Sequence, residues 1–227
     1  NNSEDLYAGD LRYYFKQLFY SRGANNPYHN IRHSLDVFLK GYDAIKYYGN
    51  IPMDDARALL IACMLHDFNH SGRAGNDDLN IELAIRGIDK ILHDKDSWLR
   101  GTICDLIKQT EFGPEGHVDK RPDFYGKIMR DADLSQACST AWIRLVVFGL
   151  AKEMQLPPAT MLRMQADFLS KVKFESEWGK EKFTLIIAEK IQEAKFYEIR
   201  RQLEYKCKWN NINLIIADRW YASSKIC

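Results

Sequence analysis

Four of the six histidines in the chain form two pairs, His29 with His33 and His66 with His70. The members of each pair are four residues apart, a spacing that places both side chains on one face if the segment is helical. Asp67 follows His66 directly, so the sequence offers an imidazole nitrogen and a carboxylate oxygen side by side. Such mixed ligands suit Zn, Mn, Fe or Mg. The spacing therefore predicts a metal site, although each histidine taken alone is typical of a hydrogen-bonded core residue.

Apolar segments precede the acidic residues that would join such a site. Residues 59–65 read LLIACML, so His66 and Asp67 end a segment that we expect to be buried, where ionisable groups need a partner. Asp131 and Asp133 also end an apolar stretch, and exposed carboxylates beside a basic residue are the alternative explanation for them. The spacing leaves both acids open, so the octahedral set of ligands would be His33, His66 and Asp67 with one of these two acids. Only the family resemblance given below favours Asp133.

The elements that must position these residues are predicted to be helices. Apolar residues recur every three or four positions over most of the chain, and the alternation typical of strands is scarce. Ile212 to Ala217 is the one candidate strand. We therefore expect a compact all-α bundle of about nine or ten helices. The clearest helical segments are Leu11 to Tyr20, Ala56 to Leu65, Leu79 to Ile91, Trp98 to Lys108, Phe124 to Asp133, Ala137 to Glu153, Pro158 to Val172 and Glu181 to Tyr205.

Length and composition agree with a single domain over residues 1–227. The 32 basic and 31 acidic residues give a net charge of +1, which argues against a nucleic-acid partner. The five cysteines are scattered without a C-x-x-C pair, as in chains that keep reduced thiols. No apolar run reaches the length of a membrane span, and the first residues do not read as a targeting segment. We expect a cytoplasmic protein without a membrane partner, for which a homo-oligomer and a longer parent chain are both open.

Several segments, in this order, resemble one known family. They are Tyr28-His29-Asn30, His66-Asp67-Phe68-Asn69-His70-Ser71-Gly72, Thr110-Glu111, Ala132-Asp133-Leu134-Ser135 and Gln165-Ala166-Asp167-Phe168-Leu169. Together they resemble the HD superfamily of metal-dependent phosphohydrolases. Within it they look most like the catalytic domain of class I 3′,5′-cyclic nucleotide phosphodiesterases. The similarity extends from about Asn25 to Trp178.

Two features depart from that family. The interval between Asp67 and Asp133 is much shorter than in the animal enzymes and contains no Glu-Asn-His-His segment. Gln136 stands where the family has an Asn that reads the base, so the resemblance does not extend to a nucleotide preference. Two other HD subclasses fit less well. The guanosine-tetraphosphate hydrolases have acidic residues where this chain has Asn69 and His70, and the Gly-Tyr-Pro signature of the cyclic-di-GMP subclass is absent.

The resemblance implies two divalent metals, zinc with magnesium or manganese, and a role for each matched residue. The tighter ion would be held by His33, His66, Asp67 and Asp133, with Asp67 bridging to the second ion. His29 would act as the general acid that protonates the leaving O3′, and His70 would support the bridging water or the phosphate. The substrate-binding residues would be Tyr28, Asn30, Gln136, Gln165 and Phe168. For Gln165 and Phe168, ordinary core packing of a helix face is the alternative.

The function that we expect is hydrolysis of a 3′,5′-cyclic nucleotide to a 5′-nucleotide by a metal-bridging hydroxide, with cAMP and cGMP both open as substrates. One alternative is another HD phosphohydrolase, such as a nucleotidase that acts on phosphomonoesters. The other is a non-catalytic HD module that binds a nucleotide. Release of inorganic phosphate from monophosphates would identify a nucleotidase. An absence of bound transition metal would indicate the non-catalytic module.

Overall fold

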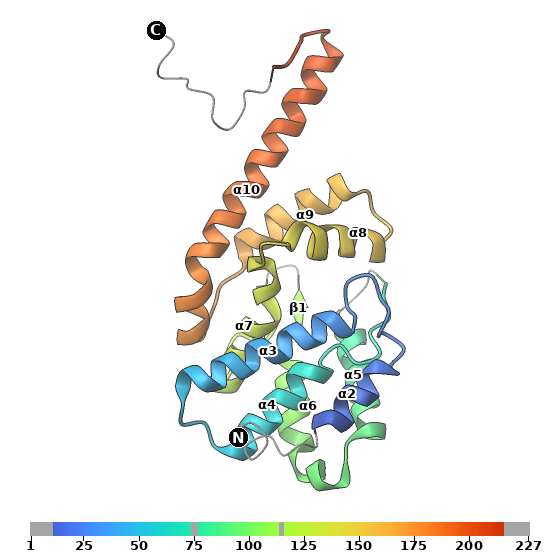
Figure 1. Cartoon of the computed structure of the whole chain (residues 1–227), viewed down its shortest axis with the longest axis vertical. Coiled ribbons are helices and arrows are strands. Elements are labelled where there is room, and N and C mark those ends of the chain that lie inside the picture. Colours follow the sequence, from blue (N-terminus) through green and yellow to red (C-terminus); the bar gives the residue numbers. More distant parts are fainter. Residues whose placement is uncertain (1–10, 74–76, 114–115, 216–227) are drawn as a thin grey trace.

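Helices account for most of what the computed structural model describes, which is residues 11–73, 77–113 and 116–215 (Figure 1). This confirms the predicted all-α fold. The α-helices are α2 (Leu11–Phe19), α3 (Ile31–Tyr48), α4 (Met53–Leu65), α5 (Asp77–Ile91), α6 (Arg100–Lys108), α7 (Phe124–Leu134), α8 (Phe148–Glu153), α9 (Pro158–Lys171) and α10 (Glu177–Trp209). The shorter elements are the 3₁₀ turns η1 (Asp94–Leu99) and η2 (Ser135–Cys138), the π-helix η3 (Ile143–Val147), and the antiparallel pair β1 (Phe112–Gly113) and β2 (Gly116–His117).

Helix α4 forms the centre of the core. It is apolar on nearly every side, and it packs against α2, α3, α6 and α7. Asp54 and Asp55 lie in its first turn, where negative charge is favoured by the helix dipole. Each fully buried leucine or isoleucine of this helix stabilises the fold by about 1.5–3 kcal/mol relative to an exposed one. The helix ends at Leu65 with His66 as its C-cap, so burial of α4 also buries His66 and leaves the following Asp67 half-buried.

Helix α3 begins directly after Asn30, whose side chain caps it. Asn30 Oδ1 accepts hydrogen bonds from the backbone N–H groups of Arg32 (2.9 Å) and His33 (3.2 Å). An N-cap of this kind satisfies N–H groups that the first turn leaves without a partner. His33 therefore lies in the first turn of α3, whereas His29 lies outside the helix.

The segment after α7 is interrupted, so the predicted continuous helix Ala137 to Glu153 is wrong. The chain forms η2, passes through an extended residue at Ser139, and then forms η3 followed by α8. Periodic apolar residues continue across this break, which is why the pattern did not reveal it. The candidate strand Ile212 to Ala217 is also wrong over residues 212–215, which form no strand, while residues 216 and 217 lie outside the described ranges.

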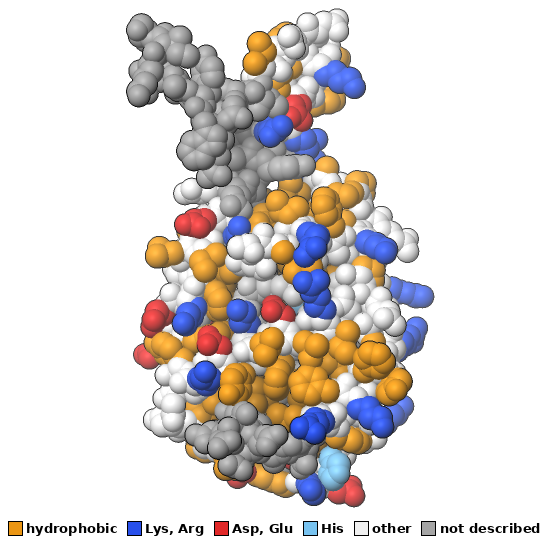
Figure 2. Space-filling view, viewed as in Figure 1, with side chains coloured by type: hydrophobic (Ala, Val, Ile, Leu, Met, Phe, Trp, Pro, Cys, Tyr) orange, Lys and Arg blue, Asp and Glu red, His pale blue; other side chains and the backbone are white. Residues whose placement is uncertain are grey.

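Helix α10 has two dissimilar halves. Near its start, Trp178, Phe183 and Ile187 are buried in the core. Beyond Ile187 none of the side chains that the structure describes is buried, and the helix projects past α8 and α9 (Figure 1). Hydrophobic and charged side chains mix on the projecting end (Figure 2). Within the described ranges no individual helix has both the length and the apolar character to cross a membrane. Within the same ranges, one pair of neighbouring helical segments, 124–138 and 143–153, is long and apolar enough when taken together, and the two segments meet at a bend of 100°.

Candidate metal centre and neighbouring histidine cluster

Four predicted ligands converge in the structure, and we call them the first cluster: His33, His66, Asp67 and Asp133. They come from the start of α3, the end of α4 and the last turn of α7. The Nε2 atoms of His33 and His66 are 3.2 Å apart. Asp67 Oδ2 lies 3.2 Å from His33 Nε2 and 3.1 Å from His66 Nε2. Asp133 Oδ1 lies 3.2 Å and 3.4 Å from the same two nitrogens.

The hydrogen bonds of the two imidazoles show which nitrogens are free to bind a cation. His66 Nδ1 donates to the backbone carbonyl oxygen of Cys63 (3.0 Å), and His33 Nδ1 donates to Gln136 Oε1 (3.2 Å). In neutral rings, both Nε2 atoms then carry lone pairs, which cannot hydrogen-bond to each other. With both rings neutral, Asp67 Oδ2, a buried oxygen beside them, also has no hydrogen-bond donor among the described residues. A cation between these atoms would satisfy all of them at once.

The spacing of the first cluster fits a metal ion. Ligand atoms that each lie about 2.0–2.2 Å from one ion are themselves about 3.0–3.4 Å apart, and the contacts within the cluster measure 3.1–3.4 Å. Two imidazole nitrogens with carboxylate oxygens suit zinc and several other divalent ions. His33, His66 and Asp133 are therefore positioned to hold a metal, with Asp67 beside both nitrogens, and the chemistry of these side chains does not select one metal over another.

The electrostatics of the first cluster favour positive charge. Burial lowers the pKa of His33, but its contacts with Asp133 and Asp67 outweigh burial and raise that pKa to about 9. Burial likewise lowers the pKa of His66, and the charges of Asp67 and Asp133 raise it well above its usual value. Burial raises the pKa of both carboxyl groups, but the neighbouring imidazoles hold them below their usual range. A site that stabilises protons in this way also stabilises a metal cation.

Asp131 and Asp133, the two acids between which the spacing could not decide, have different partners. Asp131 is fully buried and accepts hydrogen bonds from the backbone N–H groups of Glu175 (2.9 Å) and Ser176 (2.8 Å) and from the Ser176 hydroxyl (2.6 Å). Its carboxylate therefore anchors the chain just before α10. Asp133 is the acid that faces His33 and His66.

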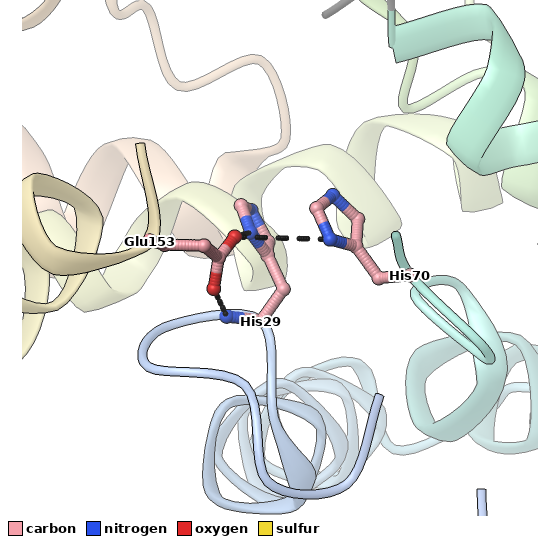
Figure 3. A group of neighbouring side chains, drawn as sticks. All are labelled: His29, His70 and Glu153. Atoms are coloured by element: carbon pink, nitrogen blue, oxygen red, sulfur yellow. Dashed lines mark hydrogen bonds and ion pairs between the residues drawn. The ribbon is translucent and has the colours of Figure 1, made fainter. Parts of the chain in front are cut away.

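A second cluster consists of His29, His70 and Glu153 (Figure 3). His29 Nδ1 donates to Glu153 Oε1 at 2.5 Å, and Glu153 Oε2 accepts from the backbone N–H groups of Tyr28 (2.9 Å) and His29 (3.1 Å). The rings of His29 and His70 stack with centroids 3.9 Å apart. His70 Nδ1 is 3.7 Å from Glu153 Oε1 and accepts the N–H of Gly72 (3.1 Å). Glu153 thus fixes one nitrogen of His29 and leaves Nε2 for proton transfer.

Glu153 was not predicted from the sequence. It is the last residue of α8, its side chain is nearly inaccessible, and no motif distinguishes it from the other acids of the chain. Burial raises the pKa of its carboxyl group, but the hydrogen bond from His29 outweighs burial and lowers it. Burial, reinforced by the neighbouring His29, lowers the pKa of His70 to about 4, so His70 is neutral near pH 7. The second cluster therefore combines an ionised Glu153 with a neutral His70. His29 hydrogen-bonds to Glu153 and stacks on His70.

The two histidine pairs do not act as the helical spacing predicted. His29 precedes α3 and His70 follows the turn after α4, so neither pair lies on one helix face. Each pair is divided instead, with one member in each cluster. The helical premise was wrong because both pairs straddle a helix end, marked by the cap at Asn30 and by Asn69 with a φ of 63°.

A cavity of about 340 Å³ opens beside both clusters. Among the predicted substrate-binding residues, Tyr28, Gln165 and Phe168 line it. Gln165 is 5% exposed, and its Oε1 is buried without a hydrogen-bond partner in the described part of the chain. Asn30 and Gln136 do not line this cavity: the first caps α3, and the second contacts His33. Phe112, for which the sequence predicted no role, has its ring 5.0 Å from that of Phe168.

The fold and the two clusters describe an all-α protein with histidine and carboxylate groups positioned to hold a metal ion. A family described as Cas12f1-like, TNB domain, matches residues 196–227. A protein of Streptomyces pristinaespiralis described as "Putative RNA-guided DNA endonuclease" is 46% identical over 41 residues, which are 18% of this chain and 10% of that protein. The 3′,5′-cyclic-nucleotide phosphodiesterase regA of Dictyostelium discoideum is 44% identical over an alignment 54 residues long, which covers 21% of this chain and 6% of that protein. The chain thus matches a tenth or less of the length of either relative.

Proposed function

We propose that the chain hydrolyses a 3′,5′-cyclic nucleotide to a 5′-nucleotide in a metal-dependent reaction, as a phosphodiesterase of the HD type. The observation that carries this proposal is the 3.2 Å approach of His33 Nε2 to His66 Nε2, with both Nδ1 atoms donating elsewhere. The similarity to a cyclic-nucleotide phosphodiesterase over 54 residues supports the choice of reaction. A single domain over residues 1–227 remains part of the proposal.

The charges that line the cavity support a requirement for divalent cations. Among the described residues that line it, four carry carboxylates, and Arg73 is the only lysine or arginine. The carboxylates are Asp67, Asp77, Asp133 and Glu153. A cavity with this excess of negative charge repels a phosphodiester anion. One divalent ion still leaves a negative excess, whereas two reverse the sign, which agrees with a pair such as zinc with magnesium or manganese.

The neighbouring residues supply the proton chemistry. When bound, the ions would neutralise the phosphate and lower the pKa of a water molecule toward neutrality. Glu153 accepts a hydrogen bond from His29 Nδ1 and so holds the ring in one orientation. From that position His29 can donate a proton from Nε2 to the leaving O3′. His70, neutral and stacked on His29, excludes water from one face of that ring.

Gln165 and Phe168 form the proposed base-binding wall. Gln165 Oε1 has no hydrogen-bond partner among the residues that the structure describes, so it can accept a hydrogen bond from a nucleobase. Phe168 is half-buried beside Phe112 and presents an aromatic surface to the same cavity. Burying an unpaired amide oxygen costs free energy unless a ligand satisfies it, which supports ligand binding over core packing.

A substrate panel analysed by mass spectrometry tests the proposal. The chain, loaded with zinc and supplied with Mg²⁺ or Mn²⁺, should convert cyclic mononucleotides to 5′-monophosphates. His66→Ala should lose bound metal and all turnover because it removes a ligand from the centre of the first cluster. Phosphate release from monophosphates with cyclic nucleotides intact would replace the proposal with a nucleotidase. Metal binding without hydrolysis of any member would indicate a non-catalytic nucleotide-binding module.

A second candidate function concerns residues 196–227 only. Their match to the Cas12f1-like TNB family, together with the relative described as an RNA-guided endonuclease, suggests nucleic acid as a partner, contrary to the expectation from net charge. Fluorescence anisotropy with short RNA and DNA oligonucleotides tests this. Binding that weakens in a Lys206→Ala, Lys208→Ala double variant would support the candidate, because both side chains are exposed in the last turn of α10. Equal binding by the variant, or none by either protein, would contradict it.

A further inference from the structure

Gln136 lies against the first cluster and away from the cavity. Its side chain is 5% exposed, and its Oε1 accepts a hydrogen bond from His33 Nδ1 at 3.2 Å. It does not line the cavity that contains Gln165. It lines a separate hollow of about 490 Å³, together with Lys40 and Phe183. A nucleotide in the first cavity would therefore not meet this amide.

One short stretch of chain contacts both nitrogens of the His33 ring. Asp133, in the last turn of α7, places Oδ1 at 3.2 Å from Nε2. Gln136, three residues later in η2, places Oε1 at 3.2 Å from Nδ1. Because α7 continues directly into η2, the two contacts share a rigid support. This arrangement fixes both the rotation of the ring and its position.

The two histidine ligands differ in what holds them. His66 Nδ1 donates to the backbone carbonyl of Cys63 in the same helix turn, an acceptor that no substitution removes. His33 depends on a side chain for the equivalent hydrogen bond. The orientation of one ligand therefore follows from the helix itself, and that of the other from the residue at position 136.

We propose that Gln136 is a positioning residue for the metal ligand His33. Its amide oxygen keeps the proton on Nδ1 and so directs the lone pair of Nε2 toward the cation. An apolar side chain at this position would leave a buried N–H without an acceptor and would release the ring to rotate. The inference rests on the proposed function, because it requires the first cluster to bind a divalent ion.

Cobalt binding by the full chain tests the inference. The probe is Co²⁺, whose visible absorption bands report ligand geometry and whose affinity is measured by competition with a chromophoric chelator. Gln136→Met keeps the length of the side chain and removes the acceptor, so we expect Co²⁺ affinity to fall by about 10–100-fold with altered bands. Gln136→Glu keeps the acceptor and should bind Co²⁺ at least as tightly as the wild type. Gln165→Met is the matched control, a second glutamine with 5% exposure whose Oε1 has no hydrogen-bond partner among the described residues, and it should leave Co²⁺ affinity and bands unchanged.

The outcomes separate this inference from the proposed function. Wild-type affinity and bands in Gln136→Met would overturn the positioning role while leaving the metal centre intact. If Gln136→Met does not fold, Gln136→Glu decides: wild-type affinity or better supports the role, and a tenfold loss contradicts it, since packing alone would then explain position 136. A wild-type chain that binds neither Co²⁺ nor Zn²⁺ would overturn the proposed function itself.

Discussion

His33 in the first cluster and His70 in the second are both buried histidines beside carboxylates, yet their pKa values shift in opposite directions. Burial lowers both values. For His33, contacts of 3.2 Å with Asp67 and Asp133 outweigh burial and raise the pKa to about 9. For His70, the nearest Glu153 oxygen is 3.7 Å from Nδ1, and the neighbouring His29 adds to burial, so the pKa falls to about 4.

This difference shows that placement of the carboxylates, and not the histidines themselves, assigns the chemistry. In the first cluster the acids surround two Nε2 lone pairs and create a position that attracts a cation. In the second, the acid occupies Nδ1 of His29, so Nε2 of that ring is the atom that can exchange a proton. The first cluster is therefore suited to holding metal, and the second to moving a proton beside it.

The largest effect that separates the two clusters is expected from His29→Ala. This variant should retain the zinc content of the wild type, because His29 is not among the first cluster, and should lose about 10²–10⁴-fold in turnover, the usual value of a general acid. Metal analysis and the rate of cyclic-nucleotide hydrolysis measure the two quantities. Glu153→Gln should retain zinc as well, with a smaller loss, because His29 remains and only its charged partner is removed. A fully active His29→Ala enzyme would show that the second cluster has no part in catalysis.

An intermediate effect is expected from the two neighbouring acids of α7. Asp133→Asn should weaken zinc binding by more than the roughly 10–100-fold that loss of a merely supporting residue costs. Asp131→Asn should leave zinc affinity unchanged and lower the free energy of unfolding by about 1–3 kcal/mol, because it disturbs buried hydrogen bonds to the backbone at Glu175 and Ser176. Chelator competition and urea denaturation of both variants measure this. The assignment of Asp133 as the ligand is wrong if the two variants exchange these behaviours.

The smallest expected step is the change of zinc affinity over one unit of pH. Since protons and zinc compete for Nε2 of His33, whose pKa is about 9, affinity should rise between pH 6.5 and pH 9 by up to about tenfold per unit for each proton displaced. In the metal-free chain, the contribution of His33 to fold stability changes with pH in the opposite direction and falls as the pH rises. The raised pKa of His33 stabilises the fold fully below about pH 6.5, and this contribution is lost as the pH rises through about 9. Zinc competition at three pH values measures the first effect, and an affinity that does not change across this window would contradict it. His70, with a pKa of about 4, contributes nothing over the same range.

Much of the fold could be predicted because it depends on local patterns. The apolar residues of α4 and the periodicity of α5, α7 and α9 gave those helices to within a few residues. The first cluster was predicted as a group, and the structure brings its four residues together. The prediction failed where a break carries no apolar signal, as between η2 and α8. It also failed to find Glu153, which lies 124 residues from His29 along the chain.

Residue types and spacing by themselves determined that this is a helical protein, and that imidazoles and carboxylates stand at the ends of buried segments. Those properties depend on hydrophobic periodicity and on the cost of burying charge, both of which can be read locally. Only the tertiary structure decided which histidines share a target, that Asp133 and not Asp131 faces them, and that Gln136 supports His33 away from the cavity. These outcomes depend on distances between atoms far apart in the chain, which packing of the helices sets and no local pattern encodes.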